Sequence, residues 1–181
     1  MSPYSRLDDE EAESPPMGEP NAFLEEALFK ARTILLTGGI DFKQAKRVCE
    51  RLLALSSANP KEPILLVISS PGGHVESGDM IHDMIKFVAA PVKVLGTGWV
   101  ASAGALIYSA AKKENRFALK NTRFLLHEPR GGVGGQATDV EIQAREILKM
   151  RERLNQIFAD ATGKSLEQIK KDTDRDFWMS A

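Results

Sequence analysis

Three kinds of group that together perform acyl transfer are present at separate points of the sequence. Ser102 lies in GWVASAGALIYSAA, residues 98–111, where an apolar strand-like run passes into an apolar helical run. His127 follows another apolar run and precedes Pro129 and a stretch with four glycines. A hydroxyl, an imidazole that takes its proton and backbone N–H groups that bind the oxyanion suffice for attack on a carbonyl carbon. Ser102 and His127 are therefore candidates for a nucleophile and its general base.

The backbone donors that such a site needs could come from the turn SSPGG at residues 69–73. Adjacent glycines ahead of a helix allow close backbone approach and direct N–H groups at a ligand. The helix that starts after Ser102 also presents unpaired N–H groups, and its dipole favours negative charge there. A carboxylate must orient the imidazole, and position alone leaves Asp172, Asp174 and Asp176 as candidates.

The elements that must position these residues recur at intervals of about thirty residues. Apolar runs typical of buried strands begin near residues 34, 64, 92 and 123, and helical patterns cover 21–32, 41–57, 75–88, 102–111 and 137–161. Strand–helix units of this length imply right-handed crossovers and a largely parallel sheet. We therefore predict an α/β fold, a spiral of repeated strand–helix units. Ligands bind at the carboxyl ends of such strands, where the candidate residues lie.

Several local features lead to further expectations. The helix at 137–161 is long enough to project beyond the domain and to pack on another subunit. Gly163 is expected to end it, and Ser165 to cap the next helix, with Gln168 completing a capping box. Cys49 reads as a buried small hydrophobe. His82 lies away from the apolar side of its helix, so we expect it to be exposed.

Composition bounds the class of protein. The chain has 181 residues, a formal net charge of −1 and 43% hydrophobic residues, which is typical of a globular protein with one core. This charge gives no electrostatic case for nucleic acid or an anionic membrane. No secretory signal or membrane-length apolar run is found, so we expect a cytoplasmic protein. Residues 1–20 are acidic and rich in proline and serine, which predicts a disordered arm before a single domain at 21–181.

Five stretches of the sequence resemble the proteolytic subunit of the Clp protease (ClpP), a self-compartmentalised serine peptidase family. They keep the order and spacing of that family and read ILLTGGID, ISSPGGHVESGDMIHDMI, GWVASAGA, NTRFLLHEPRGGVGGQATDVEIQAREILK and TGKSLEQIKKDTDRDFWMSA. The resemblance implies a fold like that of ClpP and the crotonases, in which the helix at 137–161 is a projecting handle helix. It also implies peptide-bond hydrolysis of unfolded polypeptides without a metal or an organic cofactor.

The resemblance assigns roles to individual residues. It implies Ser102 as nucleophile, His127 as general base and Asp176 as the orienting carboxylate, with the backbone N–H groups of Gly73 and Ala103 as the oxyanion hole. Phe177 and Trp178 are then expected to shield Asp176. Contacts between rings are expected at the four glycines of the handle segment, Gly131, Gly132, Gly134 and Gly135. A further ring contact is expected at Arg175, the residue before Asp176.

The same resemblance implies an assembly. Subunits of the family form heptameric rings that stack as a tetradecamer and receive substrate from a hexameric AAA+ Clp ATPase, which hydrolyses ATP on a separate chain. Family members continue beyond the position of Ala181, so we expect this chain to be truncated at its C-terminal end. Trp99 and Ala103 replace a glutamine and a methionine common in the family, so the pocket beside the serine is expected to differ.

Two alternatives to an active peptidase remain open at this point. The first is a catalytically silent or regulatory ring subunit of a mixed complex, which the unusual N-terminus and Trp99 favour. The second is a crotonase-type acyl-CoA enzyme, which would use glutamates rather than the Ser102, His127 and Asp176 set. The intact set argues against both.

Overall fold

The structure is a computed structural model, and it describes residues 22–132 and 134–181. The predicted arm at residues 1–20 lies outside this range. The elements follow one another as α1 (Ala22–Lys30), β1 (Thr33–Thr37), α2 (Phe42–Ala58), β2 (Ile64–Ser70), α3 (Val75–Phe87), β3 (Val92–Ala101), α4 (Ala103–Ser109), a 3₁₀ turn (Lys113–Asn115), β4 (Arg116–Ala118), β5 (Arg123–Leu126), α5 (Ala137–Thr162), α6 (Leu166–Thr173) and β6 (Phe177–Ser180). Strands and helices alternate through β3, as predicted.

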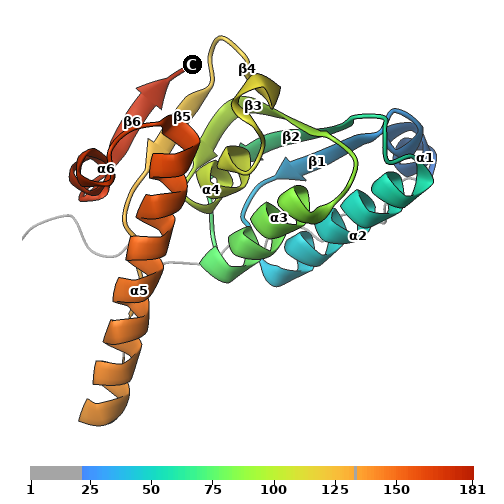
Figure 1. Cartoon of the computed structure of the whole chain (residues 1–181). Coiled ribbons are helices and arrows are strands. Elements are labelled where there is room, and N and C mark those ends of the chain that lie inside the picture. Colours follow the sequence, from blue (N-terminus) through green and yellow to red (C-terminus); the bar gives the residue numbers. More distant parts are fainter. Residues whose placement is uncertain (1–21, 133) are drawn as a thin grey trace, which may run out of the picture.

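The strands form one six-stranded sheet in the order β1-β2-β3-β5-β6, with β4 also paired to β3. All pairs are parallel except β5–β6, which is antiparallel. Helices α2, α3 and α4 lie together along the sheet (Figure 1). The predicted α/β fold with a largely parallel sheet is confirmed. The short strands β4 and β6, three and four residues long, were not predicted.

The core lies between the sheet and these helices. Along β2, alternate residues are buried, and its inward side chains Ile64, Leu66 and Ile68 are fully covered. This alternation is the two-residue period of a strand that packs one face on helices. Cys49 of α2 belongs to the same core, as expected, and burial raises the pKa of its thiol to about 11. The thiol therefore stays protonated and is no competitor to Ser102 as nucleophile.

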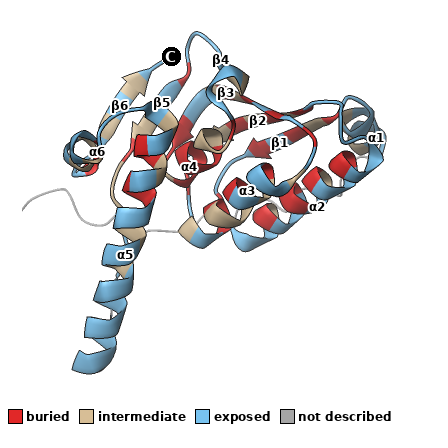
Figure 2. Cartoon of the chain, in the orientation of Figure 1, coloured by how far each residue is buried: buried red, intermediate tan, exposed pale blue. Residues whose placement is uncertain are grey.

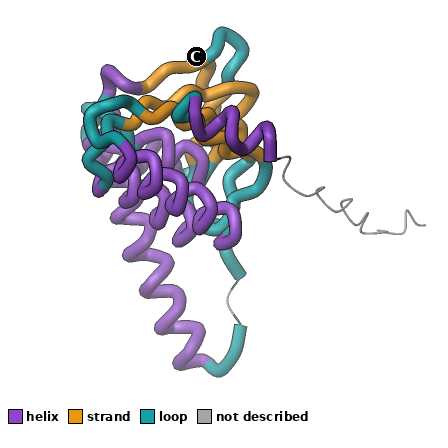
Figure 3. The backbone as a smooth tube through the Cα atoms, turned by 90° about the vertical axis from the view of Figure 1, so that its right-hand side faces the viewer, coloured by secondary structure: helices purple, strands orange, loops and turns teal. Residues whose placement is uncertain are grey.

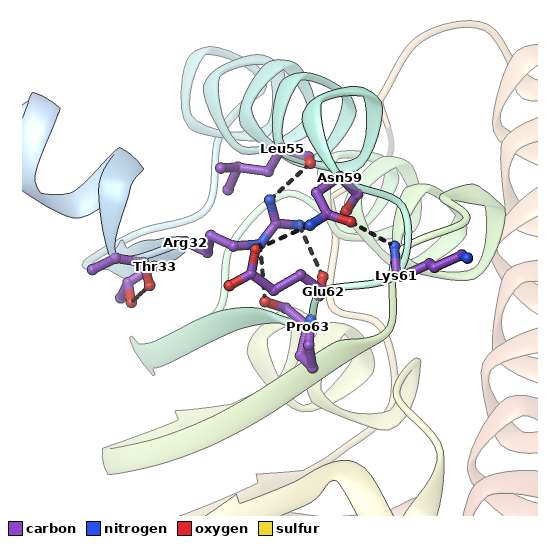
Figure 4. Close-up of polar contacts among 8 residues, drawn as sticks. Arg32, Thr33, Leu55, Asn59, Lys61, Glu62 and Pro63 are labelled. Atoms are coloured by element: carbon purple, nitrogen blue, oxygen red, sulfur yellow. Dashed lines mark hydrogen bonds and ion pairs between the residues drawn. The ribbon is translucent and has the colours of Figure 1, made fainter.

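Arg32 fastens the end of α2 to the start of β2 (Figure 4). Its guanidinium donates hydrogen bonds to four backbone carbonyl oxygens, those of Leu55, Asn59, Glu62 and Pro63, at 2.8–3.2 Å. The Leu55 carbonyl also accepts the Asn59 N–H, whereas Asn59, Glu62 and Pro63 lie after α2. A hydrogen bond from a charged donor contributes about 1.5–3 kcal/mol. One side chain thus fixes where the chain leaves α2 and enters the strand that leads to the glycine turn.

Helix α5 is the projecting helix that the sequence predicts. Figure 1 and the turned view of Figure 3 show it extending away from the body. In Figure 2 its first half is mostly exposed. Buried residues occur only toward its end, from Leu154 onward. Arg153 links the second half of α5 to α3 through two hydrogen bonds to the Asp79 carboxylate, at 2.5 and 2.6 Å. Arg116 donates to the carbonyl of Ala161 at 2.7 Å, which fixes its last turn to the body.

Two local predictions about helix ends are correct, and a third is wrong. Gly163 ends α5 in the left-handed conformation, with φ of +75°, and the Ser165 hydroxyl accepts a bond from the Gln168 backbone N–H. The reciprocal half of the capping box does not form, because the Gln168 side chain donates to Asp172 at 2.6 Å instead.

The predicted exposure of His82 is also wrong, because only 3% of this residue is accessible. Residues of α4 and α5, including Ser109 and Ile157, line the same cavity as His82, so these helices cover its side of α3. The imidazole keeps a polar partner in its neighbour, with Nδ1 2.9 Å from the Asp83 carboxylate. The apolar periodicity of α3 could not predict that His82 is buried, because the helices that cover it, α4 and α5, come later in the sequence.

Candidate active site

Ser102 occupies the turn between β3 and α4 in a backbone conformation that residues other than glycine rarely adopt. Its φ is +54° and its ψ is −120°. The turn is held on both sides, since the Ser102 N–H donates to the Leu125 carbonyl and the Ser102 carbonyl accepts from Ala105 and Leu106. Strained residues of this kind persist only where the surroundings fix them, and they gather at functional sites. The strain explains Ser102 better than packing of a small side chain alone.

The glycine turn after β2 lies directly against Ser102. A Cβ atom on Gly72 would come within 2.6 Å of the Ser102 Cβ, so only glycine fits there. The next residue, Gly73, forms an isolated parallel bridge with Ile40, in which Ile40 donates to the Gly72 carbonyl and His74 donates to the Ile40 carbonyl. In such a bridge the N–H of the central residue points away from the partner strand. The Gly73 N–H is therefore free to face a ligand beside Ser102.

Ala103 supplies the second predicted backbone donor. It is the first residue of α4, so its N–H has no partner within the helix. The side chain is buried against α3, where Gly78 leaves room for it: a Cβ on Gly78 would lie 3.1 Å from the Ala103 Cβ. Because only the backbone of Ala103 would contact an oxyanion, the change from methionine leaves this donor in place.

His127 reaches the same place from β5. This strand pairs with the last residues of β3, and Ala101 is opposite Leu125. Ser102 and His127 line one small cavity of about 20 Å³, whose other lining residues are apolar: Val75, Ala103, Leu106, Leu126, Pro129, Leu154 and Phe158. A space of this size accommodates about one water molecule. Ser102 and His127 are both half-buried, so each keeps some accessible surface at this cavity.

Asp176 lies at the same end of the sheet through β6. The antiparallel register ends with the pair Leu126 and Phe177, so His127 directly follows this pair on one segment and Asp176 directly precedes it on the other. Just beyond, the Glu128 N–H donates to the Thr173 carbonyl at 2.9 Å, which ties the two segments together. Of the three aspartates that the sequence left open, Asp176 is the one next to the paired end of β6.

The described side chains of Ser102, His127 and Asp176 form no hydrogen bonds with one another in this structure. His127 Nδ1 lies 2.6 Å from the carbonyl oxygen of Glu128, and Asp176 is paired with Arg130. The structure thus brings the three residues to one sheet end without joining them in a relay. Sequence reasoning had no signal for the Arg130–Asp176 pair, because its members are 46 residues apart.

The remaining predicted residues lie at the surface. Arg175 is 94% exposed, and its guanidinium is 3.9 Å from the Asp174 carboxylate. Of the handle glycines, Gly131, Gly132 and Gly134 are surrounded by open space, and Gly135 adopts a φ of +132°. The prediction that Phe177 and Trp178 shield Asp176 is wrong, since this carboxylate is 45% exposed. Trp178 instead lies 4.1 Å from the Arg123 guanidinium, and Phe177 faces Lys164.

Residues 22–132 and 134–181 hold no group of three or more histidine, cysteine, aspartate or glutamate side chains that could bind a metal ion. Nor does this part of the chain contain a helix long and apolar enough to cross a membrane.

Comparisons with known proteins agree with the α/β fold described above and indicate the family. The family model described as Clp protease matches residues 18–181. The chain is 58% identical to the ATP-dependent Clp protease proteolytic subunit 2 of Gluconobacter oxydans, over 99% of this chain and 79% of that protein. It is 57% identical to subunit 3 of Rhizobium etli, over 96% and 87%. A solved structure of a ClpP1 mutant from Listeria monocytogenes matches with a TM-score of 0.81 and 54% identity, over 87% and 88%. The chain therefore belongs to the Clp protease family of serine peptidases, as a proteolytic subunit.

Proposed function

We propose that Ser102, His127 and Asp176 are the catalytic triad with which this subunit hydrolyses peptide bonds. The observation that carries the proposal is the strained Ser102 turn, packed on Gly72 and lining one cavity with His127. In the reaction His127 removes the hydroxyl proton as the Ser102 oxygen attacks the peptide carbonyl carbon. The imidazolium then protonates the leaving amine, and water, activated by the same imidazole, releases the acyl group. Asp176 holds the ring and stabilises its charged form, so the mechanism needs no metal or cofactor.

The oxyanion hole is proposed to be formed by the N–H groups of Gly73 and Ala103. Negative charge develops on the carbonyl oxygen only as the tetrahedral intermediate forms, so donors fixed beforehand stabilise the transition state more than the substrate. The bridge to Ile40 fixes the first donor, and the start of α4 fixes the second.

Replacing Gly73 by alanine should lower kcat by about 10²–10³ with a smaller change in KM, because the first donor moves. A Cβ at this position would lie 2.2 Å from the Ile40 carbonyl oxygen, and its φ of +149° is strained for alanine, so the backbone must shift. The measurement is steady-state hydrolysis of a fluorogenic peptide, with thermal unfolding to confirm folding. Gly39→Ala is the matched control, since a Cβ there meets nothing within 4 Å and the residue has no positive φ. Equal kcat values for the two variants would exclude Gly73 as a donor.

The proposal extends to assembly and partners. We propose heptameric rings stacked as a tetradecamer, with Gly131, Gly132, Gly134, Gly135 and Arg175 at the contact between rings. The exposed first half of α5 and the open space around the handle glycines support this, because both leave surface for another subunit. The related subunits are named as parts of an ATP-dependent Clp protease. A hexameric AAA+ Clp ATPase that feeds unfolded polypeptides is therefore the proposed partner, and ATP is used on that chain.

We also propose that residues 21–181 act as one protease domain in the cytoplasm. One continuous hydrophobic cluster supports the single domain, since it joins β1 and α2 to the end of α5 and to α6. The crotonase-type alternative loses its basis, because the relatives at 57–58% identity are Clp protease subunits.

The test is covalent labelling of the full chain with a fluorophosphonate, followed by native mass spectrometry. The wild type should gain one label per subunit at Ser102 and show a mass near fourteen subunits, while Ser102→Ala stays unlabelled. Labelling of both proteins would exclude Ser102 as the nucleophile. An assembled but unlabelled wild type would instead support the silent ring subunit, which the lack of a hydrogen bond between His127 and Asp176 in this structure favours.

A further inference from the structure

Arg130 forms an ion pair with the carboxylate of Asp176, which the proposed triad needs to orient His127. The pair joins Arg130 to Oδ1 of Asp176, and both side chains are largely accessible, 67% and 45%. Arg130 lies three positions after His127 on the loop that leaves β5. The side chains of Arg130 and His127 therefore both start from the end of β5, beside Asp176. The carboxylate thus has two cationic candidates within one loop, the guanidinium and the protonated imidazole.

His127 has a substitute partner while Arg130 holds the carboxylate. Its Nδ1 is 2.6 Å from the Glu128 carbonyl oxygen. Nδ1–H carries one proton, which can be donated to this carbonyl or to Asp176 but is not shared equally by both. A carbonyl orients the ring, but it lacks the negative charge that stabilises an imidazolium. With this pairing, the general base is held without the electrostatic support that proton transfer requires.

The neighbouring carboxylates offer Arg130 no comparable alternative. Glu128 is paired with Arg151 at 3.1 Å, and Asp172 with Lys164 at 2.9 Å. Arg130 lies between Pro129 and Gly131. The φ angle of Pro129 is fixed by its ring, whereas Gly131 is conformationally free and has no atoms within 4 Å of where a Cβ would be. The loop can therefore turn Arg130 away on its glycine side without disturbing His127 on its proline side.

We infer that Arg130 is a positioning residue that competes with His127 for Asp176 and so restrains the peptidase in its resting conformation. The inference rests on the proposed catalytic role of these residues. Exchange of partners releases the restraint: Arg130 leaves the carboxylate, and the Nδ1–H of His127 passes from the Glu128 carbonyl to Asp176.

Arg130→Gln tests the competition in the full chain. We expect kcat for a fluorogenic peptide to rise about two- to fivefold with unchanged KM, since an exposed ion pair supplies about 0.4–1 kcal/mol. The acidic limb of the pH–rate profile should move to higher pH, because a freed carboxylate stabilises the His127 imidazolium and catalysis needs the neutral ring. Arg130→Lys keeps the charge and should stay near the wild type.

Lys46→Gln is the matched control, since it also removes an exposed positive charge paired with a carboxylate, Glu50, but lies on α2 away from the site. An unchanged acidic limb, or a fall in kcat for Arg130→Gln, would overturn the inference. Fluorophosphonate labelling of the same samples separates the two levels of the argument. If Ser102 is labelled in every variant but the rate of peptide hydrolysis does not change, only the role of Arg130 is excluded. If Ser102 is labelled in none of them, the proposed function itself is excluded.

Discussion

Ser102→Ala and His127→Ala should each lower kcat for peptide hydrolysis by about six orders of magnitude, and the double variant should be no slower than either single one. The two side chains act as one unit, because the hydroxyl is a poor nucleophile until the imidazole takes its proton. Once one of them is missing, the other has nothing left to contribute. The residual rate, about 10³–10⁴ above that in water, comes from the oxyanion hole and substrate binding.

The measurement is hydrolysis of a fluorogenic peptide at high enzyme concentration over long times, so that the residual rates remain visible. Ser109→Ala is a suitable control, since this serine lies at the end of the same helix and its hydroxyl bonds only to the Leu106 carbonyl. Losses that multiply in the double variant would show that Ser102 and His127 act independently, which contradicts a nucleophile–base pair.

The body of the fold was predictable because its elements carry local signals. Four apolar runs and the helices between them carry clear sequence signals, and the predicted starts agree with β1, β2, β3 and β5. Gly163 and Ser165 mark helix ends through backbone chemistry that acts within a few residues. The failures have a different cause. The burial of His82 and the partner of Gln168 depend on side chains that reach these positions only in the folded chain.

The site was predictable in part for the same reason. The strained serine turn and the glycine turn follow from short-range sequence, and parallel strands bring their carboxyl ends together. The residues alone left Asp172, Asp174 and Asp176 open, and only the family resemblance favoured Asp176. The register of β5 with β6 adds that Asp176 lies next to their last pair. The segment FWMS that forms β6 has four residues, too few for a reliable period, although its aromatic and apolar content is typical of a strand. Recognising it as an antiparallel partner of β5 would have placed Asp176, the proposed orienting carboxylate, next to the end of β5.

Asp176→Asn should lower kcat by about four orders of magnitude with little change in KM, because asparagine can fill the space but cannot stabilise the imidazolium or hold the required tautomer of His127. Its amide would also release Arg130, so the loss cannot be explained by a tighter resting pair. The measurement is steady-state peptide hydrolysis, together with the labelling rate of Ser102, which should fall in parallel.

The other two aspartates of this segment provide the controls. Asp172 accepts bonds from Lys164 and Gln168; these bonds, the one from Lys164 foremost, hold the pKa of its carboxyl below the usual range. Asp172→Asn should therefore lower the midpoint of thermal unfolding rather than kcat. Asp174 caps the end of α6 and is 69% exposed, so Asp174→Asn should leave kcat within about tenfold of the wild type. A four-order loss in either control, with Asp176→Asn near wild-type activity, would move the orienting carboxylate to that residue and show that the register of β6 does not decide the triad.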